Sequence, residues 1–337
     1  MPQTATIRPC FAHFLAMLGN IFELIVGLIL LIWGADRFVH GAAATARNLG
    51  IPPLLIGLTI VALATSAPEI LVSLVAALRG EPDLAVGNAI GSNIANIGLV
   101  LGVVALLRPV ELKSATLRRE MPALLAVSLL AVSLFLDSYL SRVDGLVLLT
   151  GLIIVMIWLT RLGIRSSASD PLKAEFEAEI PKHMSMRVAL LWLLVGIGTL
   201  LLGAELLVDG AVEIAQSLGV SEVVIGITMV ALFTSLPELA VSVVAAFKGE
   251  YGLAIGNIVG SNIFNLLAVL GVAASVQPAA LPPSVLSLHI FVMVAFTLVL
   301  FAMTYEYEGR GRISRFEGFA LVAAYVAYET YVIVQNV

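Results

Sequence analysis

Residues 57–102 read GLTIVALATSAPEILVSLVAALRGEPDLAVGNAIGSNIANIGLVLG, and this stretch decides the fold. It is apolar enough to lie in a lipid bilayer, yet it carries a carboxylate, hydroxyls and amides. These polar residues are Thr59, Thr65, Ser66, Glu69, Ser73, Asn88, Ser92, Asn93 and Asn96. Polar groups at membrane depth are costly, so they usually face a cavity or a pathway. The stretch therefore predicts a polar site inside a membrane protein.

The same stretch occurs a second time. Residues 226–271 read GITMVALFTSLPELAVSVVAAFKGEYGLAIGNIVGSNIFNLLAVLG. The two copies are offset by 169 residues, and 28 of their 46 aligned positions are identical. Glu69 returns as Glu238, and Asn96 returns as Asn265. The chain is therefore predicted to consist of two repeats, each with one polar segment.

The composition is that of an integral membrane protein. The chain has 337 residues, of which 60% are hydrophobic and 12% are charged, whereas soluble domains are about 25% charged. The mean hydropathy is +1.05. Cys10 is the one cysteine, so no internal disulfide framework is expected. No basic cluster indicates a nucleic-acid partner, and the expected surroundings are the lipid bilayer.

Apolar runs and turn residues predict an all-α fold with ten transmembrane helices. Their expected ranges are about 18–47, 54–79, 84–107, 121–137, 143–163, 187–217, 222–248, 252–275, 283–304 and 314–335. Residues 1–17 are an N-terminal extension, 18–163 the first five-helix repeat, 164–186 a polar linker and 187–337 the second five-helix repeat. Because each repeat has an odd number of spans, the two halves enter the membrane from opposite sides as inverted repeats.

The distribution of Lys and Arg predicts the orientation. With ten spans, fourteen basic residues fall in the loops of one side and three in the loops of the other. Cytoplasmic loops carry the excess of positive charge. We therefore expect a multi-pass protein of the cell inner (plasma) membrane, with the 164–186 linker in the cytoplasm and both termini outside.

Polar residues form stripes at helical spacing. Residues 62, 65, 66, 69 and 73 share one helix face, and so do residues 88, 92 and 96. The second repeat has the same two faces, with Ala231, Thr234, Ser235, Glu238 and Ser242, then Asn257, Ser261 and Asn265. Four such stripes meeting at the midplane would enclose a cage of oxygen atoms. Asn88, Asn93, Asn257 and Asn262 have an alternative interpretation as caps or packing contacts between helices.

Pro68 and Pro237 predict that the second and seventh helices are broken. Each proline removes a backbone hydrogen bond and clashes with the carbonyl four residues earlier, at Ala64 or Phe233. Broken helices at membrane depth are tolerated where they line a cavity, and their carbonyls commonly coordinate cations. Every donor in the cage is an oxygen atom, which suits a hard cation such as Ca²⁺ better than Zn²⁺.

At these residues the sequence resembles the cation/Ca²⁺ exchanger superfamily. The paired segments GLTIVALATSAPE and GITMVALFTSLPE, each followed by GNxxGSNIxN, are similar to the two α-repeats of prokaryotic sodium/calcium exchangers. The resemblance covers residues 20–335 and implies a secondary antiporter, not an enzyme, that exchanges Na⁺ for Ca²⁺ by alternating access without a cofactor. It implies these ion ligands: Glu69, Glu238, Thr65, Thr234, Ser66, Ser235, Ala62, Ala231, Ser92, Asn96, Ser261 and Asn265.

Asn265 departs from part of that family. Several relatives, including the potassium-dependent branch, carry Asp at this position. With Asn265 the cage keeps two acids, which favours K⁺-independent exchange. Three Na⁺ would leave the site at +1 and one Ca²⁺ would leave it neutral, so the cycle is expected to be electrogenic. We expect the protein to function as a monomer.

Three other functions stay open at this point. A Ca²⁺/H⁺ antiporter could use the same cage, with Glu69 and Glu238 exchanging protons. A cation channel is disfavoured by the inverted repeat. An intramembrane enzyme would need a nucleophile and a base, or a metal pair, and no His or Cys belongs to the cage. Asp36, Arg37 and Glu205 are expected to be structural or to lie near the membrane interface.

Overall fold

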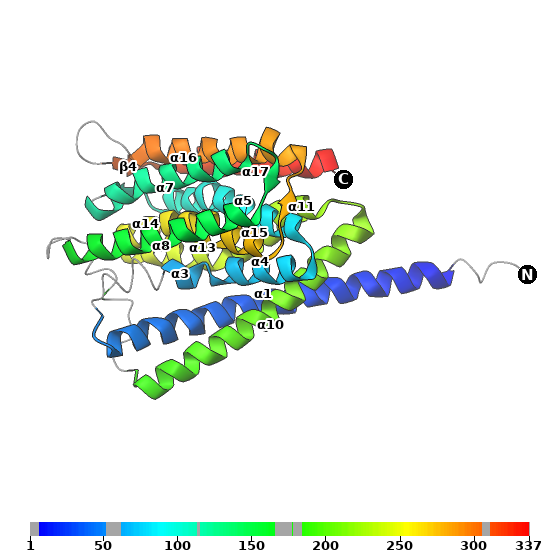
Figure 1. The fold of residues 1–337 in the computed structure, drawn as a ribbon, viewed down its shortest axis with the longest axis horizontal. Helices are drawn as coiled ribbons and strands as arrows, with labels where there is room; N and C mark the ends of the chain where they lie inside the picture. Colours follow the sequence, from blue (N-terminus) through cyan, green and yellow to red (C-terminus); the bar gives the residue numbers. More distant parts are fainter. Residues whose placement is uncertain are drawn as a thin grey trace, which may run out of the picture.

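The computed structural model describes residues 7–51, 62–112, 115–165, 177, 184–304 and 311–336, and it is almost entirely helical (Figure 1). The first half contains α1 (Ile7–Asn48), α3 (Ala62–Thr65), α4 (Ala67–Arg79), α5 (Pro82–Ala95), the π-helix η2 (Asn96–Leu101), α6 (Gly102–Leu107), α7 (Ala115–Phe135) and α8 (Arg142–Arg165). The second half contains α10 (Met186–Leu218), α11 (Glu222–Ile225), η3 (Gly226–Val230), α12 (Ala231–Thr234), α13 (Leu236–Lys248), α14 (Tyr251–Phe264), η4 (Asn265–Val269), α15 (Leu270–Val276), η5 (Val285–His289), α16 (Ile290–Thr304) and α17 (Arg315–Asn336).

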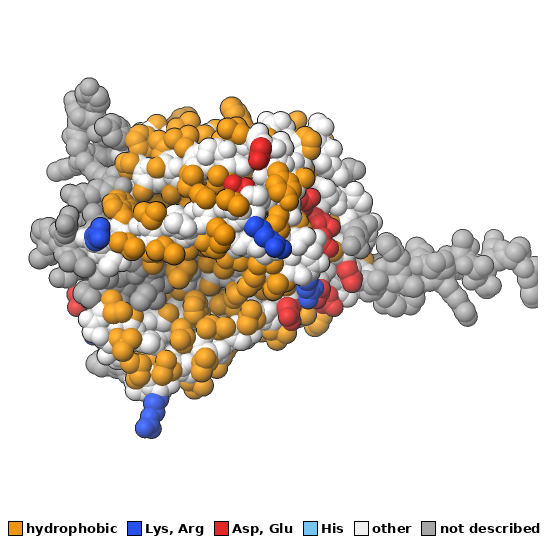
Figure 2. All heavy atoms as spheres, viewed as in Figure 1, with side chains coloured by type: hydrophobic (Ala, Val, Ile, Leu, Met, Phe, Trp, Pro, Cys, Tyr) orange, Lys and Arg blue, Asp and Glu red, His pale blue; other side chains and the backbone are white. Residues whose placement is uncertain are grey.

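The helices confirm the predicted fold class of an all-α integral membrane protein. Among the described residues, eight helical segments are long and apolar enough to cross a bilayer, and Glu120–Phe135 is a shorter apolar helix. The span expected at 54–79 is described only from residue 62 onward, as α3 and α4, so the count of ten remains a prediction. On the face seen in Figure 2, apolar side chains are spread over the described helices and charged side chains are few.

Helix α1 extends beyond the first membrane span toward the N-terminus. The sequence predicted an extension over residues 1–17 and a first span from about 18, and the structure has one continuous helix from Ile7 to Asn48 whose apolar span begins at Met17. Pro9 lies in its first turn, where a missing N–H costs no helical hydrogen bond. Nothing else between Ile7 and the span interrupts the helix.

Helices α1 and α10 pack against each other in opposite directions. A Cβ atom added to Gly27 would lie 2.8 Å from the Leu207 nitrogen, and one added to Gly34 would lie 3.0 Å from the Leu200 nitrogen. As the residue number rises along α1, that of the partner on α10 falls. These two helices begin the two repeats, so their antiparallel packing agrees with the inverted arrangement, and Figure 1 shows them crossing beside the main bundle.

Four short strands, which were not predicted, tie the two halves together at both ends of the bundle. Strand β1 (Val110–Leu112) pairs with β4 (Gly311–Ile313), and β2 (Tyr139–Leu140) pairs with β3 (Ala279–Ala280), both antiparallel. The helix α7 separates β1 from β2 and is 21 residues long, or about 30 Å. The two strand pairs therefore lie at opposite ends, and each joins a loop of one repeat to a loop of the other.

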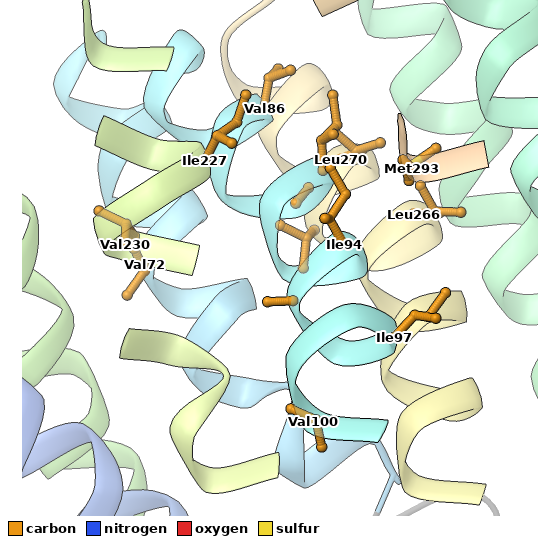
Figure 3. Packing of buried hydrophobic residues seen from close by; sticks show 14 of the residues in the cluster. Val72, Val86, Ile94, Ile97, Val100, Ile227, Val230, Leu266, Leu270 and Met293 are labelled. Atoms are coloured by element: carbon orange, nitrogen blue, oxygen red, sulfur yellow. The ribbon is translucent and has the colours of Figure 1, made fainter. Parts of the chain in front are cut away.

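The core lies around the helices that carry the repeated GNxxGSNIxN motif. Most residues of the span formed by α5, η2 and α6 are buried, and so are most of those in the span formed by α14, η4 and α15. Apolar residues from these helices and from η3 fill the space between them, as Figure 3 shows for Ile94, Leu266 and Leu270. Polar residues on the same helices must therefore be satisfied inside the protein.

An ion pair links α10 to the core at one end. Arg79, in the last turn of α4, pairs with Asp209 of α10. The repeat places Lys248 at the position equivalent to Arg79, and His40 at that equivalent to Asp209. His40 and Arg37 both pair with Asp36 of their own helix, at 3.3 and 3.6 Å. Asp36 and Arg37 are thus engaged with neighbours on their own helix.

Candidate functional site

The two repeated carboxylates are fully buried at equivalent places. Glu69 and Glu238 each have 0% of their surface exposed. Each lies in the first turn of a helix, α4 or α13, where the positive end of the helix dipole stabilises negative charge. Asn88 contacts both the Glu69 carbonyl and Thr234, which lies four residues before Glu238, so the two carboxylates lie in the same part of the core. Two buried acids with no basic partner among the described residues favour binding of a positive charge.

A one-residue interruption sets each carboxylate at a helix start. Helix α3 ends at Thr65 and α4 starts at Ala67, while α12 ends at Thr234 and α13 starts at Leu236. The linking serines, Ser66 and Ser235, have φ and ψ of −84° and 8°, and −81° and 0°. The prolines occupy the second position of α4 and α13, where helical N–H groups have no partner in any case. The interruption therefore comes two residues before each proline.

Most oxygen atoms of the two carboxylates have no partner. Among the described residues, both oxygens of Glu69 and the Oε2 atom of Glu238 have none, while Glu238 Oε1 accepts a hydrogen bond of 3.2 Å from Ser261 Oγ. The hydroxyl oxygens of Ser66 and Ser235 are buried and likewise unpartnered within the described part of the chain. Unpaired buried charges and hydroxyls cost free energy unless a ligand satisfies them.

Hydroxyl contacts bring the two repeats together symmetrically. Thr65 Oγ1 lies 3.5 Å from Ser261 Oγ, and Ser92 Oγ lies 3.4 Å from Thr234 Oγ1. Each pair joins the TSxPE helix of one repeat to the GNxxGSNIxN helix of the other. The structure thus brings together the four polar stripes that the sequence predicted.

Asparagines close one side of this cluster. Asn96 Nδ2 donates to Asn262 Oδ1 at 3.0 Å, and Asn262 Nδ2 donates to the Asn93 carbonyl at 3.4 Å. Asn262 therefore joins α14 to the other repeat, in agreement with its alternative interpretation as a packing contact. Asn96 Oδ1 and both amide atoms of Asn265 are buried, with no partner among the described residues. Asn96 and Asn265 also begin the π-helices η2 and η4, irregularities that often mark functional sites.

The two alanines among the predicted ligands differ in what the structure shows. The Ala231 carbonyl accepts a hydrogen bond from Ser235 N at 3.1 Å and lies 3.4 Å from Thr234 Oγ1. Ala62 begins α3, and its side chain lies outside the described residues, as do Gly57 and Thr59. The Ala231 carbonyl is thus engaged within its own helix, and it can bind a cation only through its second lone pair.

The donor set consists of oxygen atoms. It comprises two carboxylates, several hydroxyls and asparagine amides, and no group of three or more His, Cys, Asp or Glu able to hold a metal ion occurs in the described ranges. His289, far along the chain from the motifs, bonds Tyr328 Oη at 2.7 Å instead. Chemically, such a set can replace the hydration shell of a hard cation with two negative charges and neutral oxygens.

Asn88 and Asn257 make contacts between helices, in line with their alternative interpretation in the sequence analysis. Asn88 Nδ2 donates to the Glu69 carbonyl at 3.2 Å and to Ser73 Oγ at 2.9 Å. Asn257 makes the equivalent bonds to the Glu238 carbonyl, at 3.4 Å, and to Ser242 Oγ, at 3.1 Å. Their positions on the polar stripes, with Ser73 and Ser242 on the facing stripes, were the available signal.

Comparison with known proteins identifies close relatives. CaxA from Alkalimonas amylolytica is 47% identical over 313 residues, covering 93% of this chain and 98% of that protein. The sodium/calcium exchanger MaX1 from Methanosarcina acetivorans is 31% identical over 346 residues, covering 92% and 97%. A solved structure of the sodium-calcium exchanger NCX_Mj, soaked with Na⁺ and Sr²⁺, matches with a TM-score of 0.65 at 35% identity, covering 92% of this chain and 97% of the other.

The family model described as sodium/calcium exchanger protein matches residues 20–161 and 188–334. These two ranges correspond to the two predicted repeats and leave out the intervening polar linker. The chain therefore belongs to the sodium/calcium exchanger family.

Proposed function

We propose that this protein exchanges Na⁺ for Ca²⁺ across the inner membrane by alternating access. As a member of the family, it is a cation/Ca²⁺ antiporter, which makes it a secondary transporter and not an enzyme. The observation that carries the choice of site is the pair of buried glutamates, Glu69 and Glu238, whose oxygens are mostly unpartnered among the described residues. Two negative charges match one divalent cation.

The remaining ligands are proposed from their places around the two glutamates. Thr65 and Thr234 supply hydroxyls between the repeats, with Ser92 and Ser261 beside them. Ser66 and Ser235 offer unpartnered hydroxyls from the helix interruptions, and Asn96 and Asn265 offer amide oxygens. Ala62 and Ala231 contribute carbonyls. In this assignment Ca²⁺ and Na⁺ use the same carboxylates in turn, so they compete.

The first prediction concerns the coupling ion. Purified protein in Na⁺-loaded proteoliposomes is expected to take up ⁴⁵Ca²⁺ when diluted into Na⁺-free medium, at the same rate with and without K⁺. An imposed pH gradient without Na⁺ should drive no uptake. Uptake that follows the pH gradient alone would show a Ca²⁺/H⁺ antiporter instead. If the imposed Na⁺ gradient collapses rapidly without Ca²⁺ on the other side, the protein is a cation channel.

A second prediction concerns charge movement. The site contains two carboxylates because Asn265 is neutral. An exchange of three Na⁺ for one Ca²⁺ at this site would move one net positive charge in the Na⁺ direction. Ca²⁺ uptake into Na⁺-loaded vesicles would therefore make the interior negative. An imposed inside-positive potential should accelerate the initial rate, and an inside-negative one should slow it. Rates independent of potential would indicate electroneutral exchange.

The orientation and assembly of the protein are also proposed. The excess of Lys and Arg on one set of loops supports a cytoplasmic linker at 164–186 and external termini. The proposed site lies within one chain, built from α3, α4, α5, α12, α13, α14 and the two π-helices that follow. This supports function as a monomer.

A further inference from the structure

Asn88 has hydrogen-bond partners on three different elements around the proposed ion site. It is completely buried on α5. Its amide nitrogen contacts the Glu69 carbonyl and Ser73 Oγ, both on α4, as described above. Its amide oxygen lies 3.1 Å from Thr234 Oγ1 of α12 and 3.4 Å from Ser92 Oγ one turn along α5. Asn88 thus connects one repeat to the other at the glutamates.

The chemistry of the neighbours fixes the orientation of this amide. The Glu69 backbone carbonyl can only accept a hydrogen bond, so the amide atom beside it must be the nitrogen. The opposite amide atom is then the oxygen, which can only accept. Asn88 Oδ1 is the nearest acceptor of Thr234 Oγ1, at 3.1 Å against 3.4 Å for the Ala231 carbonyl, so Thr234 directs its proton toward Asn88. Ser92 Oγ has the same amide oxygen within reach at 3.4 Å.

This direction decides what Thr234 offers to a cation. A hydroxyl group has one proton and two lone pairs, and a cation is attracted only to the lone pairs. The Thr234 side chain also lies beside the Glu69 carboxylate, but both Glu69 oxygens meet no donor with hydrogen-bond geometry in the described chain. With its proton given to Asn88, Thr234 can present a lone pair next to that carboxylate.

The equivalent group in the other repeat is in a different state. Asn257 makes the same contacts through its nitrogen to Glu238 and Ser242. Ser261, which corresponds to Ser92, directs its proton toward Glu238 Oε1 at 3.2 Å. That proton points into the carboxylate that a cation would approach, so the Ser261 hydroxyl has to rotate before it can act as a ligand.

We propose that Asn88 is a positioning residue that accepts the hydroxyl protons of Thr234 and Ser92 and so turns both oxygens toward the cation. This inference rests on the proposed ion site and adds a residue that touches no ion itself. In this structure the hydroxyl oxygens near Glu69 therefore have lone pairs free for a cation, while the Ser261 hydroxyl near Glu238 directs its proton toward the carboxylate. A residue that only held helices together would affect ion affinity independently of Thr234.

A double-mutant cycle distinguishes these roles. Ca²⁺ binding to the purified full chain is measured by titration calorimetry for wild type, Asn88→Ala, Thr234→Val and the double variant. Each single change should weaken Ca²⁺ binding about tenfold. The double variant should also be weakened about tenfold, and not about a hundredfold, because Asn88 acts through the hydroxyl that Thr234→Val removes.

Ser261→Ala provides the matched control. Its hydroxyl bonds Glu238, so its effect and that of Asn88→Ala should multiply. If Asn88→Ala does not fold, Asn88→Ser takes its place, since its shorter side chain stays polar but does not reach Thr234. Independent effects of the Asn88 and Thr234 changes, or unchanged affinity in Asn88→Ala, would overturn the positioning role. Absence of Ca²⁺ binding in wild type would instead refute the proposed site as a whole.

Discussion

Replacement of Glu69 or Glu238 by Gln is expected to abolish Ca²⁺ exchange while leaving the protein folded. Gln has nearly the same shape, but the site would hold one negative charge for a divalent ion in a buried environment. Leaving a buried charge without its partner costs about 3–5 kcal/mol. That corresponds to a loss of affinity of roughly two to three and a half orders of magnitude.

The measurement is Na⁺-driven ⁴⁵Ca²⁺ uptake into proteoliposomes, with gel filtration and thermal unfolding to confirm that each variant is folded. Glu205→Gln is the matched control, because Glu205 is an exposed acid on α10 and should retain wild-type exchange. Both glutamates have unpartnered oxygens among the described residues, so removing either charge should also relieve their mutual repulsion and leave stability equal or higher. Wild-type uptake by either Gln variant would refute the assignment of the site.

Gly91→Ala is expected to destabilise the protein and to distort the site. A Cβ atom at Gly91 would lie 2.6 Å from the Ala231 Cβ atom and 2.7 Å from the Ile227 Cα atom. These neighbours are backbone or Cβ atoms of η3 and α12, which cannot move aside by a change of rotamer. Such overpacking typically costs about 1–3 kcal/mol. Relief of the clash would move α12, which carries Thr234, away from α5, which carries Asn88 and Ser92.

Gly198→Ala tests whether the effect comes from this contact. Gly198 lies within α10, and a Cβ atom there would meet nothing within 4 Å. Ala is favoured over Gly inside helices by about 0.5–1 kcal/mol, so this variant should unfold at the same temperature as wild type or higher. Gly91→Ala should show a lower unfolding midpoint and weaker Ca²⁺ binding. Equal midpoints for the two variants would contradict the close packing of α5 against η3 and α12.

Hydrophobic pattern and internal repetition were sufficient to predict most of the fold. The seventh span was expected at 222–248, and α11, η3, α12 and α13 together cover the same residues. The repeat also predicted that both TSxPE helices would meet both GNxxGSNIxN helices. This prediction succeeded because a membrane helix that carries a polar stripe must turn it away from lipid, toward the polar stripes of other helices.

Other features depend on contacts that a sequence pattern does not contain. Strands β1 to β4 have two or three residues each and form only because distant loops meet. Pro68 predicted a break between itself and the Ala64 carbonyl, and the chain turns inside that stretch, at Ser66. The exact residue was not predictable, because proline also suits the first turn of the next helix. The different partners of Ser92 and Ser261 were likewise invisible, since the two repeats have the same residue types at these positions.

The ion pair between Arg79 and Asp209 has a consequence for the resting state of the transporter. A carrier made of two matched inverted halves would have equal free energy in its two orientations. At the related position of the other half, His40 stands in place of the carboxylate and contacts Asp36 of its own helix, so this contact between helices is not repeated. Any displacement of α10 along α4 breaks the Arg79 contact with Asp209. An exposed pair of this kind contributes about 0.2–1 kcal/mol, so the unloaded protein should occupy one orientation about 1.4 to 5 times as often as the other.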